Sequence, residues 1–402
     1  MKKLSRVLLC CENYPPSVGG VQEVMRQIAE RLTSFGLQVT VATSTHPDRL
    51  LDTVYRGVRI VSFPITGNLV NGMKGPVENY RSFLQNSDFD VILIKAAQQW
   101  TFDAAVDILA ILRARKFFVP CGFSRLLDSR YNLYYQEMPF WLSIFDGLIF
   151  YSSEYQDIKF ARMHGLKNIH CLANGVDERE FADLDDHNIR SRLGIPESHD
   201  LLLSVGTQIA AKGHWEVLRA FSNVKLSRPA TLVINGNMPV NGFFSHFMQF
   251  SKLLLTGRWP LKLEALRFSL SSPNKRVIIS DLPRSELVNL YKAADLFVFA
   301  SHVEYSPLVL FEAAAAGTAF IASPAGNSRE IAQWTEAGCI LERDLKARCS
   351  LNTRKLAQKI KEMTADKSLL IEIGRRGRNN IFNKGFTWDK IVFDYLSLLT
   401  NS

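Results

Sequence analysis

The chain has 402 residues, too many for one ordinary hydrophobic core, so two domains are expected. It carries 48 Lys and Arg against 39 Asp and Glu, a formal net charge of +9, and its mean hydropathy is −0.01. The positive excess is spread along the chain, which disfavours nucleic acid as a partner, and no apolar run reaches the roughly 20 residues of a membrane-spanning helix.

The cysteines and the first residues indicate a cytoplasmic protein. The six cysteines form no Cys-x-x-Cys pattern, which disfavours a zinc site or a disulfide framework: Cys10, Cys11, Cys121, Cys171, Cys339 and Cys349. The apolar run at residues 7–11 ends at Glu12 and is too short for a signal peptide. We therefore expect reduced thiols in a soluble or peripheral protein.

Strand-like and helix-like segments alternate through the first half. Residues 6–11 form an apolar run typical of a buried strand, and residues 13–20 follow as a loop rich in proline and glycine. Residues 21–35 carry apolar side chains at helical spacing, and Gly36 ends that helix. Further strands are predicted at 39–42, 91–94, 117–119 and 148–150. This alternation is typical of a parallel sheet with helices on both faces.

The second half repeats the pattern. Strands are predicted at 201–205, 231–235, 277–280 and 296–300, and helices at 215–224, 285–294 and 308–316. Residues 173–177 and the polar stretch 183–188 are expected to link the halves. The predicted fold class is therefore α/β, with two doubly wound parallel-sheet domains facing across a cleft. Because ligands bind beyond the carboxyl ends of parallel strands, functional motifs are expected in the loops that follow strands.

The loop after the first strand ends in Gly19-Gly20 and runs directly into a helix. Glycine lets the backbone approach a bound group closely, and the free amides at a helix start favour an anion. A phosphate could therefore bind here. The same residues are equally compatible with a tight turn that only requires glycine, because the chain has neither a G-x-G-x-x-G pattern nor a Walker A loop.

A second loop follows the predicted strand 201–205 and contains Gly206 and Lys212-Gly213. A lysine presented by a glycine-flanked loop beyond a strand is suited to neutralising a diphosphate. Taken alone, a solvated surface lysine is the commoner explanation of such a residue.

The third loop follows the predicted strand 296–300 and places Glu304 beyond its carboxyl end. Pro307 is predicted as the first residue of a helix that is apolar except for Glu312. A carboxylate buried without partners costs several kcal/mol, so Glu312 requires a hydrogen-bonding ligand or neighbour, and two sugar hydroxyls would serve. The apolar residues around it leave little polar face for a solvated glutamate.

In order and spacing, these motifs resemble the retaining glycosyltransferases of family 4, which have the GT-B fold. The similar segments are Pro15-Pro16 with Gly19-Gly20, Asn174-Gly175-Val176-Asp177, Gly206 with Lys212-Gly213, residues 287–295, Glu304 to Glu312 as an E-x7-E motif, Ala325-Gly326 with Glu330, and Phe386-Thr387-Trp388. The resemblance implies an acceptor-side domain at 1–175, a nucleotide-sugar donor domain at 176–384, and a C-terminal helix at 385–402 that crosses back to the first domain.

The resemblance also implies roles for these residues. Lys212 would bind the donor diphosphate, Glu304 would stabilise positive charge on the transferred sugar, and Glu312 would hold the ribose hydroxyls. Backbone amides would bind the phosphate oxygens, at Gly19, Gly20, Gly206, Ser306, Leu308 and Val309. Neither a cofactor nor a metal ion is expected, because amides and basic side chains neutralise the leaving diphosphate in such enzymes.

The sequence departs from the family pattern at three places. Thr207-Gln208 follows Gly206 where an arginine is common, which weakens phosphate neutralisation unless another cation such as Arg125 takes over. Cys121 stands where the family often has a histidine that contacts the transferred sugar. The commoner Gly-Phe-Gly after the first glutamate is replaced by Tyr305-Ser306-Pro307, which bears on sugar choice.

An insertion without a family counterpart is predicted at about residues 238–276, since a single connection rarely needs so many. Residues 241–276 hold six basic side chains against Glu264 alone, mixed with six aromatic ones. Two interpretations stay open: a surface that contacts anionic lipid at the inner face of the membrane, or a helical insertion that packs its aromatic residues on the domain.

The leading hypothesis is a hexosyltransferase that acts on a glycan or lipid-linked acceptor in surface polysaccharide biosynthesis. A nucleotide-sugar epimerase of similar architecture and a catalytically silent binding subunit are the alternatives. Replacing Glu304 and Lys212 by alanine discriminates, because an enzyme loses turnover and a binding subunit does not.

Overall fold

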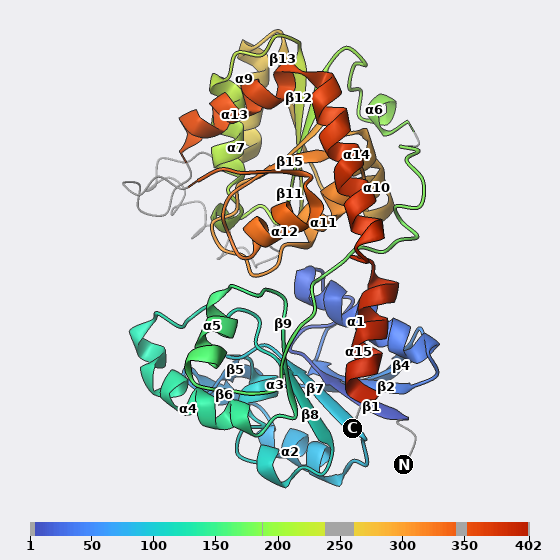
Figure 1. The fold of residues 1–402 in the computed structure, drawn as a ribbon, viewed down its shortest axis with the longest axis vertical. Coiled ribbons are helices and arrows are strands. Elements are labelled where there is room, and N and C mark those ends of the chain that lie inside the picture. The colour runs from blue at the N-terminus through green and yellow to red at the C-terminus, as the bar shows by residue number, and fades with distance from the viewer. Residues whose placement is uncertain (1–4, 187, 238–260, 343–351, 401–402) are drawn as a thin grey trace. The chain divides into compact units, whose positions relative to one another are not determined.

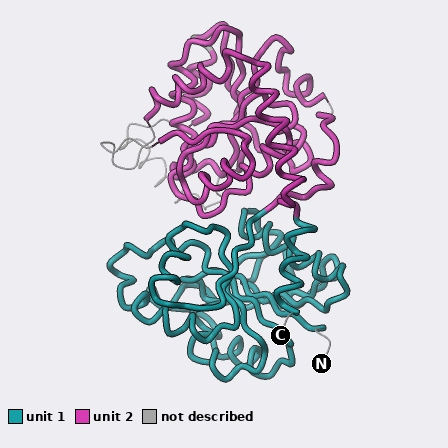
Figure 2. The backbone as a smooth tube through the Cα atoms, in the orientation of Figure 1, with its two compact units in different colours: residues 1–174, 388–402 teal, residues 175–387 magenta. Residues whose placement is uncertain are grey.

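The computed structural model describes residues 5–186, 188–237, 261–342 and 352–400, and the labels of Figure 1 are used for its helices and strands. The chain divides into two compact units (Figure 2). Unit 1 comprises Met1–Asn174 and Trp388–Ser402, and unit 2 comprises Gly175–Thr387. Each unit is built on its own mainly parallel sheet, so the α/β fold class predicted from the alternation is confirmed.

The described part of unit 1 contains an eight-stranded sheet with the order β10-β9-β8-β7-β1-β2-β4-β3. The strands are β1 (Arg6–Cys10), β2 (Gln38–Ser44), β3 (Asp52–Tyr55), β4 (Val58–Phe63), β7 (Val91–Lys95), β8 (Arg115–Val119), β9 (Gly147–Phe150) and β10 (Ile169–Cys171). Neighbouring strands are parallel except for β3 and β4. A small antiparallel pair, β5 (Thr66–Asn68) and β6 (Gly72–Lys74), stands apart from this sheet.

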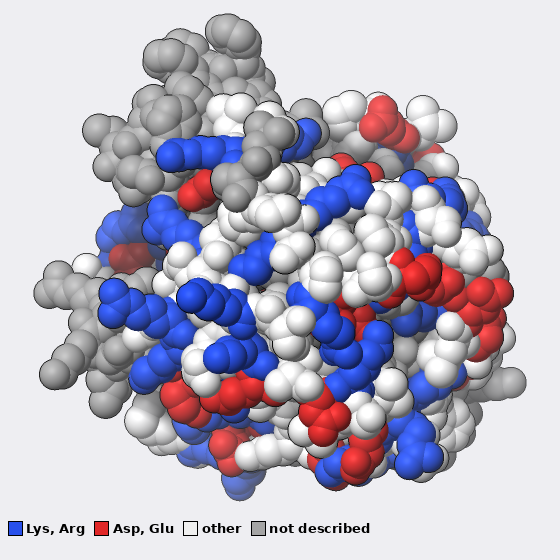
Figure 3. All heavy atoms as spheres, turned by 90° about the horizontal axis from the view of Figure 1, so that it is seen from above, with Lys and Arg blue, Asp and Glu red and all other residues white. Residues whose placement is uncertain are grey.

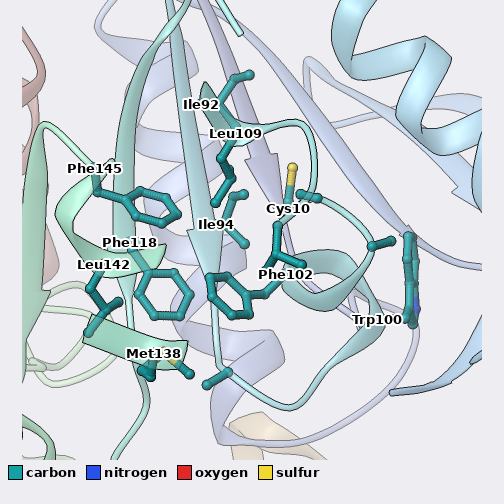
Figure 4. Packing of buried hydrophobic residues seen from close by; sticks show 14 of the residues in the cluster. Cys10, Ile92, Ile94, Trp100, Phe102, Leu109, Phe118, Met138, Leu142 and Phe145 are labelled. Carbon is teal, nitrogen blue, oxygen red and sulfur yellow. The ribbon is translucent and has the colours of Figure 1, made fainter. Parts of the chain in front are cut away.

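Helices pack against this sheet and close its core. They are α1 (Gly20–Ser34), α2 (Val77–Asn86), α3 (Trp100–Asp103), α4 (Asn132–Ser143) and α5 (Gln156–Met163), with short 3-10 turns at Leu109–Ile111 and Ser129–Tyr131. Aromatic rings fill the region shown in Figure 4. Phe102 stacks on Phe118 with the ring centroids 4.5 Å apart, and Phe118 lies 5.1 Å from Phe145. The strands β1 and β7 are almost wholly buried, which explains their continuous apolar sequences.

The last helix, α15 (Trp388–Thr400), belongs to unit 1 and packs on α1. Its buried side chains recur at helical spacing. Arg31 Nε of α1 lies 2.6 Å from Asp389 Oδ1, and Arg115 Nη1 donates to the carbonyl of Leu399 at 2.9 Å. The helix α15 is therefore attached to α1 near its first residue and to β8 of the sheet near its last residue.

The described part of unit 2 contains a six-stranded, entirely parallel sheet with the order β13-β12-β11-β14-β15-β16. The strands are β11 (Asp200–Val205), β12 (Ala230–Asn235), β13 (Lys275–Ser280), β14 (Leu296–Phe299), β15 (Ala319–Ala322) and β16 (Gly338–Ile340). The helices are α6 (Ile189–Arg192), α7 (His214–Asn223), α9 (Leu261–Ser271), α10 (Arg284–Ala293), α11 (Leu308–Ala315), α12 (Ser328–Thr335), α13 (Thr353–Ala365) and α14 (Lys367–Asn383), with a 3-10 turn at Ala210–Lys212.

Residues 261–276 of the predicted insertion pack within unit 2, which agrees with the second of the two open interpretations and not with a lipid-facing surface for these residues. Lys275 and Arg276 pair with Ala230 and Thr231 as the first residues of β13. The ring of Phe268, on α9, lies 6.0 Å from that of Phe221, and Lys275 Nζ donates to the carbonyl of Phe221 at 2.7 Å. The side chains of Phe268 and Lys275 therefore make their contacts within unit 2. Residues 241–260, the rest of the proposed lipid-facing segment, lie outside the described residues.

Charge on the face shown in Figure 3 is mixed: Lys and Arg side chains are numerous, and Asp and Glu side chains are interspersed among them. This face therefore carries no unbroken basic stripe of the kind that follows a nucleic-acid backbone. Within the part of the chain that the structure describes, no helix is both long and apolar enough to cross a membrane.

Candidate active site

The candidate site in unit 2 lies at the carboxyl edge of its sheet. The central strands β11 and β14 are neighbours in parallel register, with Leu202 opposite Leu296 and Leu203 opposite Phe297. The loops that follow them, residues 206–213 and 300–307, therefore emerge at the same edge. This is the position at which open parallel sheets bind their ligands.

The two loops are held together by hydrogen bonds and by a close approach of their backbones. Ser301 Oγ donates to the carbonyl of Ala211 at 3.0 Å, and the backbone amide of His302 donates to the same carbonyl at 2.8 Å. Gly213 has φ +71°, and a Cβ atom there would lie 2.0 Å from the carbonyl oxygen of Ala300. Only glycine permits this backbone conformation and this approach together.

Lys212 and Glu304, which sequence reasoning assigned to one site, are in direct contact. Lys212 Nζ lies 2.5 Å from Glu304 Oε1, and Ser301 Oγ donates to that oxygen at 2.9 Å. The side chains are 29% and 16% exposed, so water screens their attraction less than it would on an open surface. The solvated-lysine interpretation of Lys212 is therefore wrong for this structure.

His214, the first residue of α7, contacts the start of the loop 206–213 and the end of β11. Its Nε2 lies 2.9 Å from the carbonyl oxygen of Gly206, and its Nδ1 lies 3.2 Å from Ser204 Oγ. A carbonyl only accepts, so Nε2 carries the proton and Nδ1 accepts from the serine hydroxyl. Burial is the main cause that lowers the pKa of His214 to about 4, which keeps this neutral tautomer at physiological pH.

Gln208, the second residue after Gly206 and the neighbour of Thr207 at the position where an arginine is common, has a structural use in this chain. Gln208 Nε2 donates to the carbonyl of Gly236 at 2.6 Å, and the backbone amide of Gln208 donates to that of Asn237 at 2.9 Å. A Cβ atom on Gly236 would lie 1.8 Å from the carbonyl oxygen of Gly206. Gln208 therefore ties the loop after β11 to the loop after β12 and supplies no charge.

The helix α11 begins at Leu308, as in the predicted range 308–316, but Pro307 precedes the helix and is not its first residue. Pro307, with φ −72° and ψ 111°, is the N-cap, and α11 starts at Leu308 because the extended ψ places the proline outside the helix. The amides of Leu308 and Val309 lie in the first helical turn, where a helix offers no internal acceptor. The preceding loop is held by the amide of Asn327, which donates to the carbonyl of Tyr305 at 2.8 Å.

Glu312 has the partner that its burial requires. Its side chain is 9% exposed, and its Oε1 lies 2.6 Å from Nη1 of Arg284, the first residue of α10. The prediction that Glu312 needs a ligand or a neighbour is confirmed, and the neighbour is a cation. Sequence reasoning missed Arg284 because nothing in the local pattern connects the start of α10 with α11.

The glycines predicted in unit 1 lie at the start of α1. Gly19 is the N-cap with φ 164°, which is extended backbone that any residue adopts, and Gly20 is the first helical residue. Arg49 Nη1 donates to the carbonyls of Tyr14 and Pro15 at 3.0 and 2.5 Å and fixes the loop between β1 and α1. The first-turn amides of α1 remain available to an anion, and the conformation of Gly19 does not itself require glycine.

Cys121 and Arg125 follow β8 at the carboxyl edge of the unit 1 sheet. Cys121 has φ +59°, and the next amide, that of Gly122, donates to Asp157 Oδ2 at 2.8 Å. Burial raises the pKa of the Cys121 thiol, so it is protonated at neutral pH. Arg125 Nη1 lies 3.4 Å from Asp128 Oδ2 on the surface, so its charge is already paired.

Two buried polar groups of unit 1 were missed by sequence reasoning. Lys95, the last residue of β7, is 1% exposed; it donates to Tyr151 Oη, and burial lowers the pKa of its amine. Asp103 accepts from Tyr134 Oη at 2.6 Å and from the amide of Leu69 at 2.8 Å, and burial raises its pKa to about 6. Their only signal in the sequence is a charged residue at or after the end of an apolar strand.

The chain matches two family models in succession. Residues 18–180 match the model described as Glycosyltransferase Family 4, and residues 185–380 match Glycosyl transferases group 1. Together with the two α/β units and the loops after β11 and β14, these matches show that the chain belongs to the GT-B glycosyltransferases of the family 4 type.

Individual relatives agree with this class. N-acetyl-alpha-D-glucosaminyl L-malate synthase of Bacillus anthracis is 23% identical over 94% of this chain and 93% of its own length. The solved structure of sucrose-phosphate synthase from Thermosynechococcus elongatus matches with a TM-score of 0.77 at 18% identity, over 98% of both chains. A glycosyltransferase from Rickettsia africae matches with a TM-score of 0.72 at 17% identity over the full length of both. These relatives are glycosyltransferases, so the epimerase alternative is set aside.

Proposed function

We propose that this glycosyltransferase moves a hexose-type sugar from a nucleoside diphosphate donor to a glycan or lipid-linked acceptor, with retention of anomeric configuration. The observation that carries the proposal is the 2.5 Å contact between Lys212 Nζ and Glu304 Oε1 at the carboxyl edge of the unit 2 sheet. It places a cation suited to a diphosphate beside a carboxylate suited to the positive charge of a reacting sugar.

The donor diphosphate is assigned to the Lys212 side of this pair. The amides of Gly206 and of the α11 start, at Ser306, Leu308 and Val309, would bind its oxygens. Gly19 and Gly20, at the start of α1 in unit 1, are proposed to contribute further amides. The carboxylate of Glu312 would accept hydrogen bonds from the ribose hydroxyls.

In the proposed reaction, the bond between the anomeric carbon and the phosphate oxygen breaks, and its electron pair leaves with the diphosphate. The acceptor hydroxyl oxygen forms the new bond on the same face, and its proton passes to the departing phosphate oxygen. Glu304 stabilises positive charge on the sugar ring, and Lys212 stabilises the negative charge of the leaving group. In the structure, Lys212 and Glu304 form an ion pair with each other. Donor binding would therefore bring the charges of the substrate beside this ion pair.

Known structures of similar fold support a nucleotide-sugar donor. One neighbour, HepE of Anabaena, is described as a complex with UDP and glucose, and another, trehalose-6-phosphate synthase of E. coli, as bound with UDP-2-fluoro glucose. A third, WaaG, is described as a glycosyltransferase involved in lipopolysaccharide biosynthesis, which supports a role in surface polysaccharide biosynthesis. For the acceptor and sugar side we propose Cys121 and Arg125 in unit 1.

Peripheral contact with an anionic membrane is proposed for residues 241–260 alone. This stretch has a basic and aromatic composition, with Phe243, Phe244, Phe247, Phe250, Lys252, Arg258 and Trp259. Replacing Lys252 and Arg258 by glutamine should reduce co-sedimentation with phosphatidylglycerol vesicles. Equal co-sedimentation of the variant and the wild-type chain would contradict the contact.

Transfer and its stereochemistry are tested with purified protein and a panel of nucleotide sugars. Proton NMR of the released or transferred sugar should show the donor's anomeric configuration first, and Lys212→Met should lower turnover by about 100-fold or more. Inverted product would contradict retention. Wild-type protein that binds a nucleotide sugar but turns over none, with Lys212→Met equally inert, would support the silent binding subunit instead.

A further inference from the structure

The guanidinium of Arg284 lies between two carboxylates beside the proposed donor site, and none of the roles given above uses it. Its Nη1 is 2.6 Å from Glu312 Oε1. Its Nε lies 3.1 Å from both carboxylate oxygens of Glu180, and its Nη2 lies 2.5 Å from Glu180 Oε2. Glu180 therefore binds the edge of the guanidinium formed by Nε and Nη2, and Nη1 contacts Glu312.

Glu312 is a buried carboxylate with a cationic neighbour. Helix α11 is apolar around it, and a buried carboxylate costs free energy unless it is paired. Within the described ranges, Arg284 is the cation paired with Glu312. The hydroxyl of Tyr291 is also buried beside it, and burial together with the neighbouring Glu312 carboxylate raises the pKa of Tyr291.

The geometry leaves part of Glu312 for a ligand. Arg284 is bound to Oε1, so Oε2 and one further lone pair of the carboxylate can accept two hydroxyl hydrogens. Glu180 fixes the plane of the guanidinium through its two oxygens, which in turn fixes the direction of Nη1. Two hydroxyls on adjacent carbons, as in a ribose, match such a carboxylate.

We propose that Arg284 is a positioning residue that makes the donor site specific for ribonucleotides. Held by Glu180, it keeps Glu312 in one orientation, so that the carboxylate binds both ribose hydroxyls and discriminates against a deoxyribose. This inference rests on the proposed function, because it assigns Glu312 to the ribose of the donor. A site whose carboxylate is poised for two hydroxyls loses affinity when one hydroxyl is missing, since its acceptor is then left buried and unpaired.

A purely structural ion pair makes a different prediction. Such a pair would stabilise the packing of α10 on α11, and its loss would lower stability and weaken all nucleotides alike. Positioning of Glu312 instead changes the preference between a ribonucleotide and its 2′-deoxy counterpart. The ratio of the two dissociation constants therefore separates the two explanations, even where a variant is less stable.

The test is isothermal titration calorimetry on the full chain with UDP, GDP and ADP, the tightest of which is compared with its 2′-deoxy counterpart. The wild-type chain should bind the ribonucleotide about 10-fold or more tightly than the deoxyribonucleotide. Arg284→Met should weaken ribonucleotide binding by about 10- to 100-fold and bring the ratio close to one. Arg284→Lys should give an intermediate ratio, because an ammonium keeps the charge but not the fork.

A matched control is the ion pair between α6 and α10. Arg192 Nη2 is 2.7 Å from Glu286 Oε1 of α10 in an exposed pair, so Arg192→Met removes an ion pair without touching Glu312. It should leave the ratio unchanged. Glu180→Gln is a second test variant, which replaces Arg284→Met if that variant does not fold. In Glu180→Gln, the preference for the ribonucleotide over the deoxyribonucleotide should fall by a factor of about three or more. An unchanged ratio in both Arg284→Lys and Glu180→Gln would overturn this inference alone, and a wild-type chain that binds none of the three nucleotides would overturn the proposed function with it.

Discussion

At the scale of single residues, the protonation of His214 links the sequence to the shape of the loop 206–213. The imidazole is buried, donates to the carbonyl of Gly206 and accepts from Ser204, so only its neutral form satisfies both contacts. In the segment Lys212-Gly213-His214, one side chain thus contacts Glu304, and the other contacts the start of the same loop.

The lowered pKa of His214 predicts a pH dependence of stability. Its pKa is about 4 in the folded chain against 6.5 for the ordinary residue, so the unfolded chain binds the proton more readily. The contribution of the neutral form is fully present above pH 6.5 and is lost as the pH falls towards 4, a change of about 3 kcal/mol. Denaturant unfolding of wild type and His214→Phe between pH 7 and pH 4 should show this slope in the wild type only. Equal slopes in the two chains would contradict the assignment.

At the scale of elements, the contact between the loops after β11 and β14 determines the site. Gly213→Ala introduces both a left-handed alanine and a clash with the carbonyl of Ala300, so the loops must separate. We expect a loss of about 3 kcal/mol or more in the free energy of unfolding, and a loss of turnover of at least about 10-fold. Thermal unfolding and initial-rate measurements check both.

Gly36→Ala is the control for this variant. Gly36 has a similar φ of +88°, and a Cβ atom there would meet nothing within 4 Å. Only the left-handed backbone then contributes, about 1 to 2 kcal/mol, with unchanged turnover. Equal effects of the two substitutions would show that the close approach of the loops has no importance.

The attachment of α15 to α1 gives a second prediction at this scale. Asp389→Asn leaves the nearly buried Arg31 guanidinium without its carboxylate, so a loss of about 1 to 2 kcal/mol is expected in denaturant unfolding. Asp394→Asn removes an exposed pair with Lys390 on the same helix and should cost less than about 0.5 kcal/mol. Indistinguishable midpoints for the two variants would contradict the anchoring role of Arg31.

The elements differ in how far the sequence predicts them. Strands such as β1, β7 and β11 are predictable from their continuous apolar runs, and the loops after β1 and β11 add glycine or proline as a further signal. The antiparallel strand β3 and the pair β5–β6 are not, because they are short, exposed and without an apolar run. In the site, Glu304 and Lys212 are recognisable by their place after strands, whereas Arg284 is found only through packing of α10 on α11.

At the scale of the whole molecule, the separation of predicted roles between the two units follows the matched family models, one in each half of the chain. The proposed donor groups lie mainly in unit 2, whereas in unit 1 Lys95 ends β7, Cys121 follows β8 and Asp103 ends α3. The sequence does not determine the acceptor, because these unit 1 groups are ordinary residue types that only the fold brings to one edge.

The proposed electrostatics also predict how the enzyme responds to chelators. Lys212 and the amides at the start of α11 would neutralise the leaving diphosphate, so turnover should stay within about twofold in excess EDTA. Initial rates with and without EDTA, followed by addition of Mg²⁺ or Mn²⁺, measure this. A loss of turnover restored by either ion would contradict the assignment of neutralisation to protein groups alone.

The most direct test of the account compares Glu304→Gln with Glu312→Gln in steady-state kinetics with the best nucleotide sugar. Both keep the side-chain shape and remove the charge. Because Glu304 contacts Lys212 and Glu312 contacts Arg284, Glu304→Gln should lower kcat by about 100-fold with little change in KM for the donor, and Glu312→Gln should raise that KM by about 10-fold or more with a smaller change in kcat. Equal effects on both parameters, or no effect of Glu304→Gln, would contradict the division of roles between the two glutamates.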